Sequence, residues 1–333
     1  MPVFRLDLER RVTVAEDFLL GRQDAQGLWP DFELAPGRSE AWTTAGVAFA
    51  LAQPPLHRSA GSALRRAADA LHRLRREGGW GYNRHTAADA DTTSWTLRFL
   101  TQIDDVRSLE AARLLMTFVD GEGSAHTFRG DRFGTWSGVH ADVAPLVGLA
   151  LDGAGASEAA SMVRAACSKG EVDHDPPWRS FWWTSDAYAV ARNLELLSTG
   201  SGVSAALGHR VAKWLGGRGE RADAFELSQL LDCALRVANP AALGWAERLL
   251  RRQRGRGDWP ASACLRVPAQ HPSSGADGRA GGGGLFITAM AILSLKDLLQ
   301  RLPLGGVSSK GEAFSGGGPD EPGEANSSGQ GPC

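Results

Sequence analysis

The sequence lacks the features that mark several classes of protein. Its four cysteines are widely separated and none stands in a Cys-x-x-Cys pair, so neither a zinc knuckle nor a disulfide framework is expected. No run of about 18 apolar residues occurs, which excludes a predicted transmembrane helix. The charged first ten residues lack the apolar centre of a signal peptide. These absences predict a reduced, cytoplasmic protein; a peripheral membrane contact and a homo-oligomer stay open.

The sequence also has no large excess of positive or negative charge. The net charge is −2 over 333 residues, so no electrostatic footprint for nucleic acid is present and no nucleic-acid partner is expected. Tyrosine occurs only twice, against eleven tryptophans. Tryptophan has a large aromatic face that is costly to place unless the protein uses it, so the excess of tryptophan over tyrosine is the first indication of function.

Tryptophan recurs in a short pattern, Gly-x-Trp. Copies end at Trp29, Trp80, Trp136 and Trp259, and Trp178 follows two prolines where a further copy would stand. A short polar stretch and then a helical pattern follow each of them. Repetition at such intervals is typical of a repeat architecture whose units bury their apolar faces on their neighbours.

The repeat predicts six pairs of helices. Segments that are apolar on most faces begin near Ser39, Asp91, Val139, Ser185, Arg221 and Leu285. Amphipathic segments with an arginine-rich side alternate with them at 8–20, 58–77, 106–119, 155–168, 202–216 and 240–254. Signals for β-strands are weak. We predict an all-α fold, a double-layered (α/α)6 barrel or α/α toroid of six helix-pair repeats, with the apolar helices inside.

Two segments depart from the repeat. Residues 261–284 contain two prolines and four consecutive glycines, and a loop of this length is either a functional lid or disordered. Residues 304–333 are rich in glycine, serine and proline, and they bury too little apolar surface to fold. We therefore predict a barrel domain over 1–303 and a disordered tail over 304–333.

The stretch Asp89-Ala90-Asp91-Thr92-Thr93 stands at the start of the second inner helix. Inner-helix starts face the mouth of such a barrel, so one carboxylate can cap the helix while the other points into the cavity. Two acids in different environments are a way to keep one carboxyl protonated beside a charged one. The alternative is that both acids serve only the helix end.

This stretch resembles the DxDTT variant of the DxDD motif of class II terpene cyclases. The tryptophan turns resemble the QW repeats of squalene-hopene cyclases, which share a prenyltransferase-like repeat; Gln23 to Trp29 fits QxxxGxW, and Gln253 to Trp259 is similar. The resemblance implies a terpene cyclase, an isomerase acting on a hydrophobic isoprenoid. It implies catalytic roles for Asp91, which protonates an alkene, for its neighbour Asp89, and for Thr92.

The resemblance also implies partners for the acid. His140 or Asp142, at the start of the third inner helix, would orient the proton, and His140 is the better candidate. Aromatic faces stabilise carbocations through their quadrupoles. The substrate-binding candidates, besides Asp142, are Trp42, Trp95, Phe181, Trp182, Trp183 and Phe286. No metal site and no cofactor are expected, apart from Mg²⁺ if the substrate is a diphosphate, which the DxDTT form favours.

Other readings remain. Class II cyclases normally have two α/α domains and this chain has room for one, so a lid or a second subunit would close the cavity, or the pocket is shallow. A zinc prenyltransferase β-subunit needs Asp-x-Cys, whereas Asp232 and Cys233 are adjacent. A carbohydrate-active (α/α)6 enzyme would also use paired acids and tryptophan platforms. A non-catalytic isoprenoid-binding barrel is the last alternative.

Overall fold

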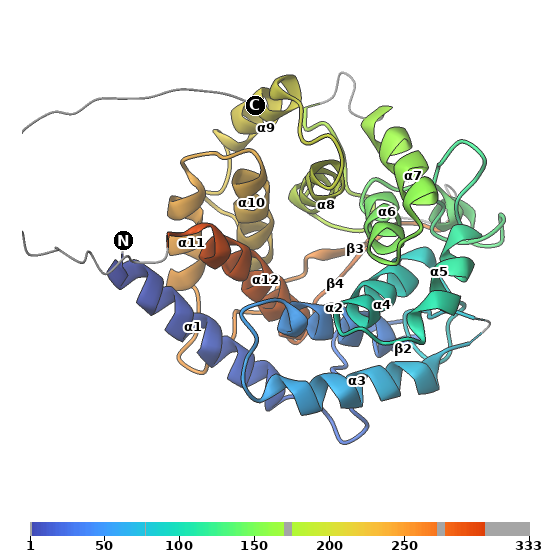
Figure 1. Ribbon diagram of the computed structural model, residues 1–333, viewed down its shortest axis with the longest axis horizontal. Helices are drawn as coiled ribbons and strands as arrows, with labels where there is room; N and C mark the ends of the chain where they lie inside the picture. Colours follow the sequence, from blue (N-terminus) through green and yellow to red (C-terminus); the bar gives the residue numbers. More distant parts are fainter. Residues whose placement is uncertain (1, 77, 170–174, 272–276, 304–333) are drawn as a thin grey trace, which may run out of the picture. The chain divides into compact units, whose positions relative to one another are not determined.

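The computed structural model describes residues 2–76, 78–169, 175–271 and 277–303, and over these ranges the chain forms two concentric layers of helices (Figure 1). Each inner helix packs against the next, and the last packs against the first, so the inner layer is a closed ring. The inner helices are α2 (Ala41–Ala52), α4 (Ala90–Gln102), α6 (Ala144–Gly153), α8 (Ala187–Ser198), α10 (Ala224–Arg236) and α12 (Leu285–Arg301).

The outer layer supplies one helix for each inner one. Its members are α1 (Pro2–Leu20), α3 (Ala60–Leu74), α5 (Ser108–Met116), α7 (Ser157–Lys169), α9 (Ala205–Leu215) and α11 (Ala242–Arg251). Every residue of α2 is buried, whereas α3 buries a single face. The predicted all-α barrel with its apolar inner layer is thus confirmed. The predicted tail 304–333 lies outside the described residues, and no helix within them is long and apolar enough to cross a membrane.

The tryptophan turns join the two layers. In four of them the indole Nε1 donates to a carbonyl near the end of the preceding outer helix: Trp29 to Leu19 (2.6 Å), Trp80 to Leu71 (2.6 Å), Trp178 to Cys167 (3.3 Å) and Trp259 to Leu249 (2.7 Å). This bond satisfies a carbonyl that the helix itself leaves unpaired. The repeated tryptophan is therefore a staple between successive helices.

Glutamine and glycine complete two of these turns. Gln23 donates to the carbonyls of Gly27 and Ala63, and so links its turn to α3. Gly27 has a φ of +88°, and a Cβ there would collide with the carbonyl of Arg66. Only glycine combines that backbone conformation with so close an approach. The turn around Gln253 repeats the arrangement against α1.

Trp136 does not belong to this series. It lies in a short 3-10 helix, Gly134–Ser137. Its indole donates to the carbonyl of Pro268, in the segment 261–284, at 2.8 Å. The third Gly-x-Trp copy is therefore not a repeat staple, although its sequence pattern is the same. Its indole lies at the open end of the barrel instead.

The first and last helices close the ring through two buried polar contacts. Asp31 accepts hydrogen bonds from the backbone N–H groups of Gly283 and Phe286, and so caps α12, whose own cap residue, Gly284, has no side chain. At the other end of α12, buried Lys296 pairs with Glu16 of α1 at 2.7 Å. We call these two contacts the seam of the barrel.

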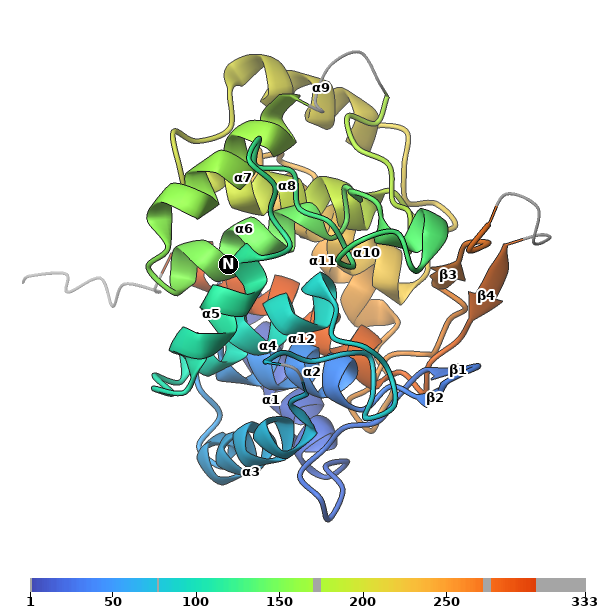
Figure 2. The same cartoon turned by 90° about the vertical axis from the view of Figure 1, so that its right-hand side faces the viewer.

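Two small antiparallel hairpins lie at one end of the barrel (Figure 2). They are β1 (Glu33–Leu34) with β2 (Gly37–Arg38), and β3 (Leu265–Val267) with β4 (Gly278–Ala280). The weak strand signals in the sequence did not predict them. The second hairpin occupies the described part of the segment 261–284; residues 272–276 lie outside the described residues.

Candidate active site

A cavity of about 210 Å³ opens at the N-terminal ends of the inner helices, beneath the two hairpins. Leu34 and Pro36 of the first hairpin and Leu265 and Val267 of the second form its rim. Six aromatic side chains contribute to its wall: Trp42, Tyr82, Phe128, Trp136, Trp182 and Trp183. Among the described residues that line it, Asp89 and Asp91 alone are charged residue types. The cavity is thus an apolar pocket with an acid pair at one side.

Asp89 is the N-cap of α4. Its Oδ1 accepts from the backbone N–H of Thr92 at 2.6 Å, and its Oδ2 accepts from the Thr92 hydroxyl at 3.0 Å. Burial raises the pKa of Asp89 to about 7, although the bonds from Thr92 act in the opposite direction. The local sequence explains this geometry, because aspartate is a preferred N-cap residue and the third helical residue presents the free N–H.

Asp91 lies in the first turn of α4 and contributes to the cavity wall. Its Oδ1 is buried and has no hydrogen-bond partner within the part of the chain that the structure describes. Burial raises the pKa of Asp91 well above its ordinary value, and the negative charges of Asp89 and Asp142 raise it further, whereas the nearby indole of Trp42 lowers it. Asp91 therefore combines a strongly raised pKa with a buried carboxyl oxygen to which no described residue bonds.

Asp142 holds the opposite wall in place. Its Oδ2 accepts from the backbone N–H of Phe181 at 2.8 Å and from that of Trp182 at 2.7 Å. Burial raises the pKa of Asp142 to about 6, against the effect of these bonds. The side chain fixes the loop that carries Trp182 and adds negative potential at Asp91, but it does not line the cavity.

His140 has a different place from the one expected. Its Nδ1 accepts from the Thr127 hydroxyl at 2.7 Å, and its Nε2 donates to the Thr135 carbonyl at 3.0 Å. Burial lowers the pKa of His140 to about 4, so the ring is neutral at pH 7. Because both nitrogens are engaged, the expected direct bond to the acid pair is not formed. The link is indirect, since the Thr127 carbonyl accepts from Ala90 N–H at 2.9 Å.

The predicted aromatic residues fall into two layers. Trp42, Trp182 and Trp183 line the cavity. Phe286 lies fully buried behind them, with its ring centroid 4.7 Å from that of Trp42 and 5.6 Å from that of Trp183. Trp95 is also fully buried, 6.3 Å from Phe286.

Phe181 does not line the cavity; it stacks on His140 with ring centroids 3.8 Å apart and meets Trp182 edge-on at 5.1 Å. Sequence reasoning missed three wall residues, Tyr82, Phe128 and Trp136. Tyr82 points its hydroxyl to the Phe32 carbonyl at 2.7 Å and so turns its ring toward the pocket. The only signal in the sequence was the Gly-x-Trp pattern at Trp136, which suggested a structural role instead.

Comparison with known proteins places this geometry in context. No protein-family model and no curated protein matches the chain. Among solved structures, the apo form of the type II terpene cyclase MstE from Scytonema matches with a TM-score of 0.76 at 25% identity, covering 90% of this chain and 99% of that one. The chain has the fold of a type II terpene cyclase. MstE is covered almost completely by one barrel, so a single barrel is not half of that protein.

Other solved structures agree on the fold. A substituted form of MstE in complex with geranylgeranyl dihydroxybenzoate matches with a TM-score of 0.77 at 23% identity, covering 91% of this chain and all of the other. A protein from Actinoplanes matches with a TM-score of 0.73 at 27% identity, with 87% and 99% covered. A heparin-specific unsaturated glucuronyl hydrolase is more distant, with a TM-score of 0.58 at 12% identity over 88% and 97%.

Proposed function

We propose that the chain is a class II terpene cyclase in which Asp91 protonates a carbon–carbon double bond of a polyprenyl chain. The state of Asp91 carries this proposal: a neutral carboxylic acid, with Oδ1 buried and unpartnered, in the wall of an aromatic pocket. An alkene is a very weak base, so its protonation needs an acid that is poorly solvated and aimed at the carbon. Asp142, with a pKa of about 6, is ionised at neutral pH, and its negative charge would hold that proton on Asp91 until substrate arrives.

The aromatic wall suits the reaction that follows protonation. A carbocation needs surroundings that exclude water and stabilise positive charge without reacting with the cation. Indole faces provide such surroundings through their quadrupoles. Trp42, Trp182 and Trp183 supply such faces, and Phe286 behind them keeps their orientation by stacking. Loss of a proton from the last cation would give a product isomeric with the substrate.

The charge of the lining argues against a diphosphate substrate. Asp89 and Asp91 are the charged types among the described lining residues, and no arginine, lysine or histidine stands with them to bind phosphate. We therefore propose a polyprenyl chain on a head group other than a diphosphate, such as a hydroxyaromatic ring. MstE, which is crystallised with geranylgeranyl dihydroxybenzoate, supports this class. This proposal departs from the expectation that the DxDTT form gives, a diphosphate with Mg²⁺.

The carbohydrate-active alternative is less well supported. A glycosidase needs two carboxyl groups that both reach the sugar. Here both carboxyl oxygens of Asp89 accept hydrogen bonds from Thr92, and the pocket wall is largely apolar. Polar hydroxyl groups would find few partners on such a wall.

The test is incubation of the purified protein with geranylgeranyl dihydroxybenzoate, geranylgeranyl diphosphate and squalene, followed by mass spectrometry and NMR of the products. We expect an isomeric, cyclised product from the prenylated aromatic compound. Asp91→Asn should reduce its rate by about 10³-fold or more, because proton transfer from a positioned acid contributes about 10²–10⁴-fold. A folded protein that converts none of these compounds, or an Asn variant as active as wild type, would overturn the proposal.

Asp223→Asn is the matched control. Asp223 caps the inner helix α10 by accepting from Glu226 N–H at 2.9 Å, and it does not line the cavity. Asparagine is as good an N-cap as aspartate, so this variant should retain wild-type activity and stability.

A further inference from the structure

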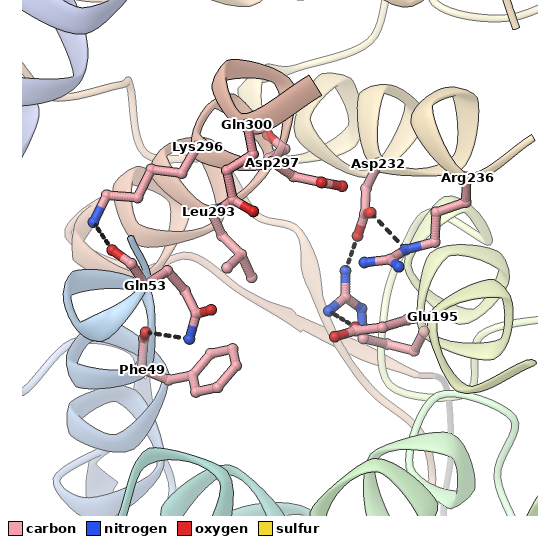
Figure 3. A pocket seen from close by; sticks show the side chains of 11 residues that line it. Phe49, Gln53, Glu195, Asp232, Arg236, Leu293, Lys296, Asp297 and Gln300 are labelled. Carbon is pink, nitrogen blue, oxygen red and sulfur yellow. Dashed lines mark hydrogen bonds and ion pairs between the residues drawn. The ribbon is translucent and has the colours of Figure 1, made fainter. Parts of the chain in front are cut away.

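A cavity of about 200 Å³ lies at the opposite end of the barrel from the candidate active site, where the inner helices end (Figure 3). Glu195, Asp232 and Arg236 stand on one side of it, and Gln53 and Lys296 on the other (Figure 3). The charged groups on the first side belong to a buried network of ion pairs.

This network joins three inner helices. Arg192 pairs with both Glu195 and Asp232, and Asp232 also accepts from Arg236 at 3.0 Å. Arg98 of α4 pairs with Glu195 of α8. These two helices are separated by α6 in the ring, so this ion pair crosses the inside of the barrel. Because both carboxylates have arginine partners, the network holds helices together, and we assign it no ligand.

A different cavity, of about 320 Å³, lies on the flank of the barrel, where α6, α7 and α8 meet. We call it the side cavity. Ala144 of α6, Ala166 of α7 and Asn193 of α8 line it, together with residues of the loops that precede α6 and α8. Most of the lining side chains are apolar, and the one charged type among the described lining residues, Arg179, is exposed. Apolar hollows with few polar groups are typical of small-molecule sites.

Asn193 is the buried polar side chain of the side cavity, with 1% of its surface exposed. Its Nδ2 donates to the carbonyls of Ala141 at 2.7 Å and of Ala189 at 2.8 Å. Because both partners are acceptors, the orientation of the amide is fixed. Its Oδ1 is buried and has no hydrogen-bond partner among the described residues. Buried polar atoms are almost always bonded, so Oδ1 calls for a donor from outside the described chain.

The side cavity shares a wall with the candidate active site. Val139 and Ala141 line the side cavity. The next residue, Asp142, fixes the loop that carries Trp182, and Trp182 lines the substrate pocket. Earlier in that loop, Pro177 lines the side cavity as well. The segments 139–142 and 177–183 therefore border both cavities.

The size and chemistry of the side cavity define the ligand that it would take. An apolar cavity of about 150 Å³ binds benzene, so about 320 Å³ accommodates a molecule of about two rings. The apolar lining favours an uncharged ligand. We propose that the side cavity binds an uncharged apolar alcohol or phenol of this size, whose hydroxyl donates to Asn193 Oδ1, and that this ligand stabilises the wall around Asp142 and Trp182.

The stabilising effect follows from linkage. A ligand favours the conformation to which it binds, here the one in which the segments 139–142 and 177–183 form the shared wall. In this conformation Asp142 holds Trp182 against the substrate pocket. The ligand should therefore raise the affinity of the protein for its prenyl substrate. That last consequence rests on the proposed function, whereas binding and stabilisation of the wall do not.

The first test is calorimetric titration with 2-naphthol and with naphthalene, which has the same rings and no donor. The protein should bind 2-naphthol at least about fivefold more tightly, the ratio that one hydrogen bond of ordinary strength gives. In Asn193→Leu, which replaces the acceptor by an apolar group of similar size, this preference should disappear. No binding of 2-naphthol, or equal binding of the two compounds by wild type, would overturn the proposal.

A second variant locates the site without touching the amide. Ala166→Phe places a phenyl ring in the side cavity and should weaken binding of 2-naphthol by about tenfold or more. Ala165→Phe is the matched control, because Ala165 is the preceding residue of α7, is exposed and does not line the cavity. It should bind as wild type does. Equal binding by the two variants would place 2-naphthol elsewhere and contradict the proposal.

The effect on the shared wall is measured by amide hydrogen exchange. The backbone N–H groups of Phe181 and Trp182, which bond to Asp142, should exchange about fivefold more slowly when 2-naphthol is bound. Unchanged exchange in a protein that binds would exclude the stabilising role. In the cyclisation assay the ligand should lower KM by about fivefold in wild type and in Ala165→Phe, but not in Ala166→Phe.

The outcomes separate the two proposals. A rise in KM that persists in Ala166→Phe would show that 2-naphthol competes in the substrate pocket, which contradicts the role given to the side cavity. A wild type that binds 2-naphthol, loses this binding in Ala166→Phe and shows slower exchange, but cyclises nothing, would contradict the proposed function alone.

Discussion

Two buried carboxyl groups, Asp91 and Glu195, lie at opposite ends of the barrel and have neighbours of opposite charge. At the N-terminal end, Asp91 has Asp89 and Asp142 as its charged neighbours, and its pKa is raised. At the C-terminal end, burial would raise the pKa of Glu195 as well, but Arg192 and Arg98 outweigh it and hold that pKa at about 2. Burial is common to both ends. The difference lies in the sign of the neighbouring charges.

The helix dipole acts against this pattern at both ends. It favours a charged carboxylate at a helix N-terminus, where the pKa of Asp91 is raised, and disfavours one near a C-terminus, where the pKa of Glu195 is lowered. Its contribution is about 0.3–1 kcal/mol, and charges within a few ångströms in a poorly solvated site exceed it. Local partners therefore decide the protonation state, and one end is suited to chemistry while the other holds the barrel together.

The largest effect is expected at the C-terminal end. Glu195→Gln removes the negative partner of Arg98 and Arg192, both of them buried. Breaking a buried ion pair from one side costs about 3–5 kcal/mol, so urea denaturation should show a loss of this size. Replacing Arg236, the most exposed member of the network, by Lys is the milder control. A Glu195→Gln protein as stable as wild type would show that the ion pairs do not hold the barrel.

Replacing the carboxyl group of Asp91, at the other end of the barrel, by an amide should change stability in the opposite direction. Groups whose pKa is raised in the folded state, such as Asp142 at about 6 and Asp89 at about 7, bind more protons folded than unfolded, so stability falls as pH rises from about 4 to about 7. Asp91→Asn removes the group with the least favourable environment. It should be more stable than wild type at pH 8 by about 1–3 kcal/mol, with a smaller difference at pH 4.

Thermal unfolding at the two pH values measures this difference. A variant that loses activity and also loses stability at pH 8 would contradict the comparison. Glu195 predicts the reverse pH dependence, because a group with a lowered pKa contributes stability that is lost as pH falls below about 4.

A smaller effect separates the two uses of tryptophan. Trp136→Phe removes the indole donor to Pro268, a bond worth about 1 kcal/mol, together with the five-membered part of the ring, and it should loosen the second hairpin and raise KM more than it lowers kcat. Trp80→Phe removes the bond to Leu71 and should lower the melting temperature instead. If the two variants behave alike, Trp136 is a staple after all.

The smallest effect on stability is expected for Asp89→Asn, because asparagine also caps a helix well. The change removes a negative charge beside Asp91 and thereby lowers the pKa of Asp91. Activity that requires protonated Asp91 should therefore be lost at a lower pH than in wild type. The measurement is kcat/KM against pH, and a descending limb that stays in place would show that Asp89 does not act on Asp91.

The helices could be predicted because their signals are local. The apolar face of α3 and the cap at Asp89 depend on residues that are close together in the sequence, and both occur where the pattern placed them. The pocket wall was harder. Trp136 shares its Gly-x-Trp pattern with three of the staples and differs only in meeting Pro268, which lies far along the chain. The partners of His140 likewise depend on the path of a loop, which no periodicity describes.

The seam has a consequence for biosynthesis. Asp31 and Glu16 find their partners, Gly283 and Lys296, only when the end of the barrel has left the ribosome. Until then the growing chain is an open arc with an uncovered edge on α2, and the cavity at the C-terminal ends of the inner helices lacks the wall that α12 supplies. Contacts between residues so far apart in the chain form slowly, and exposed apolar edges aggregate. A protein of this design should therefore depend on chaperones late in synthesis, at the step of ring closure.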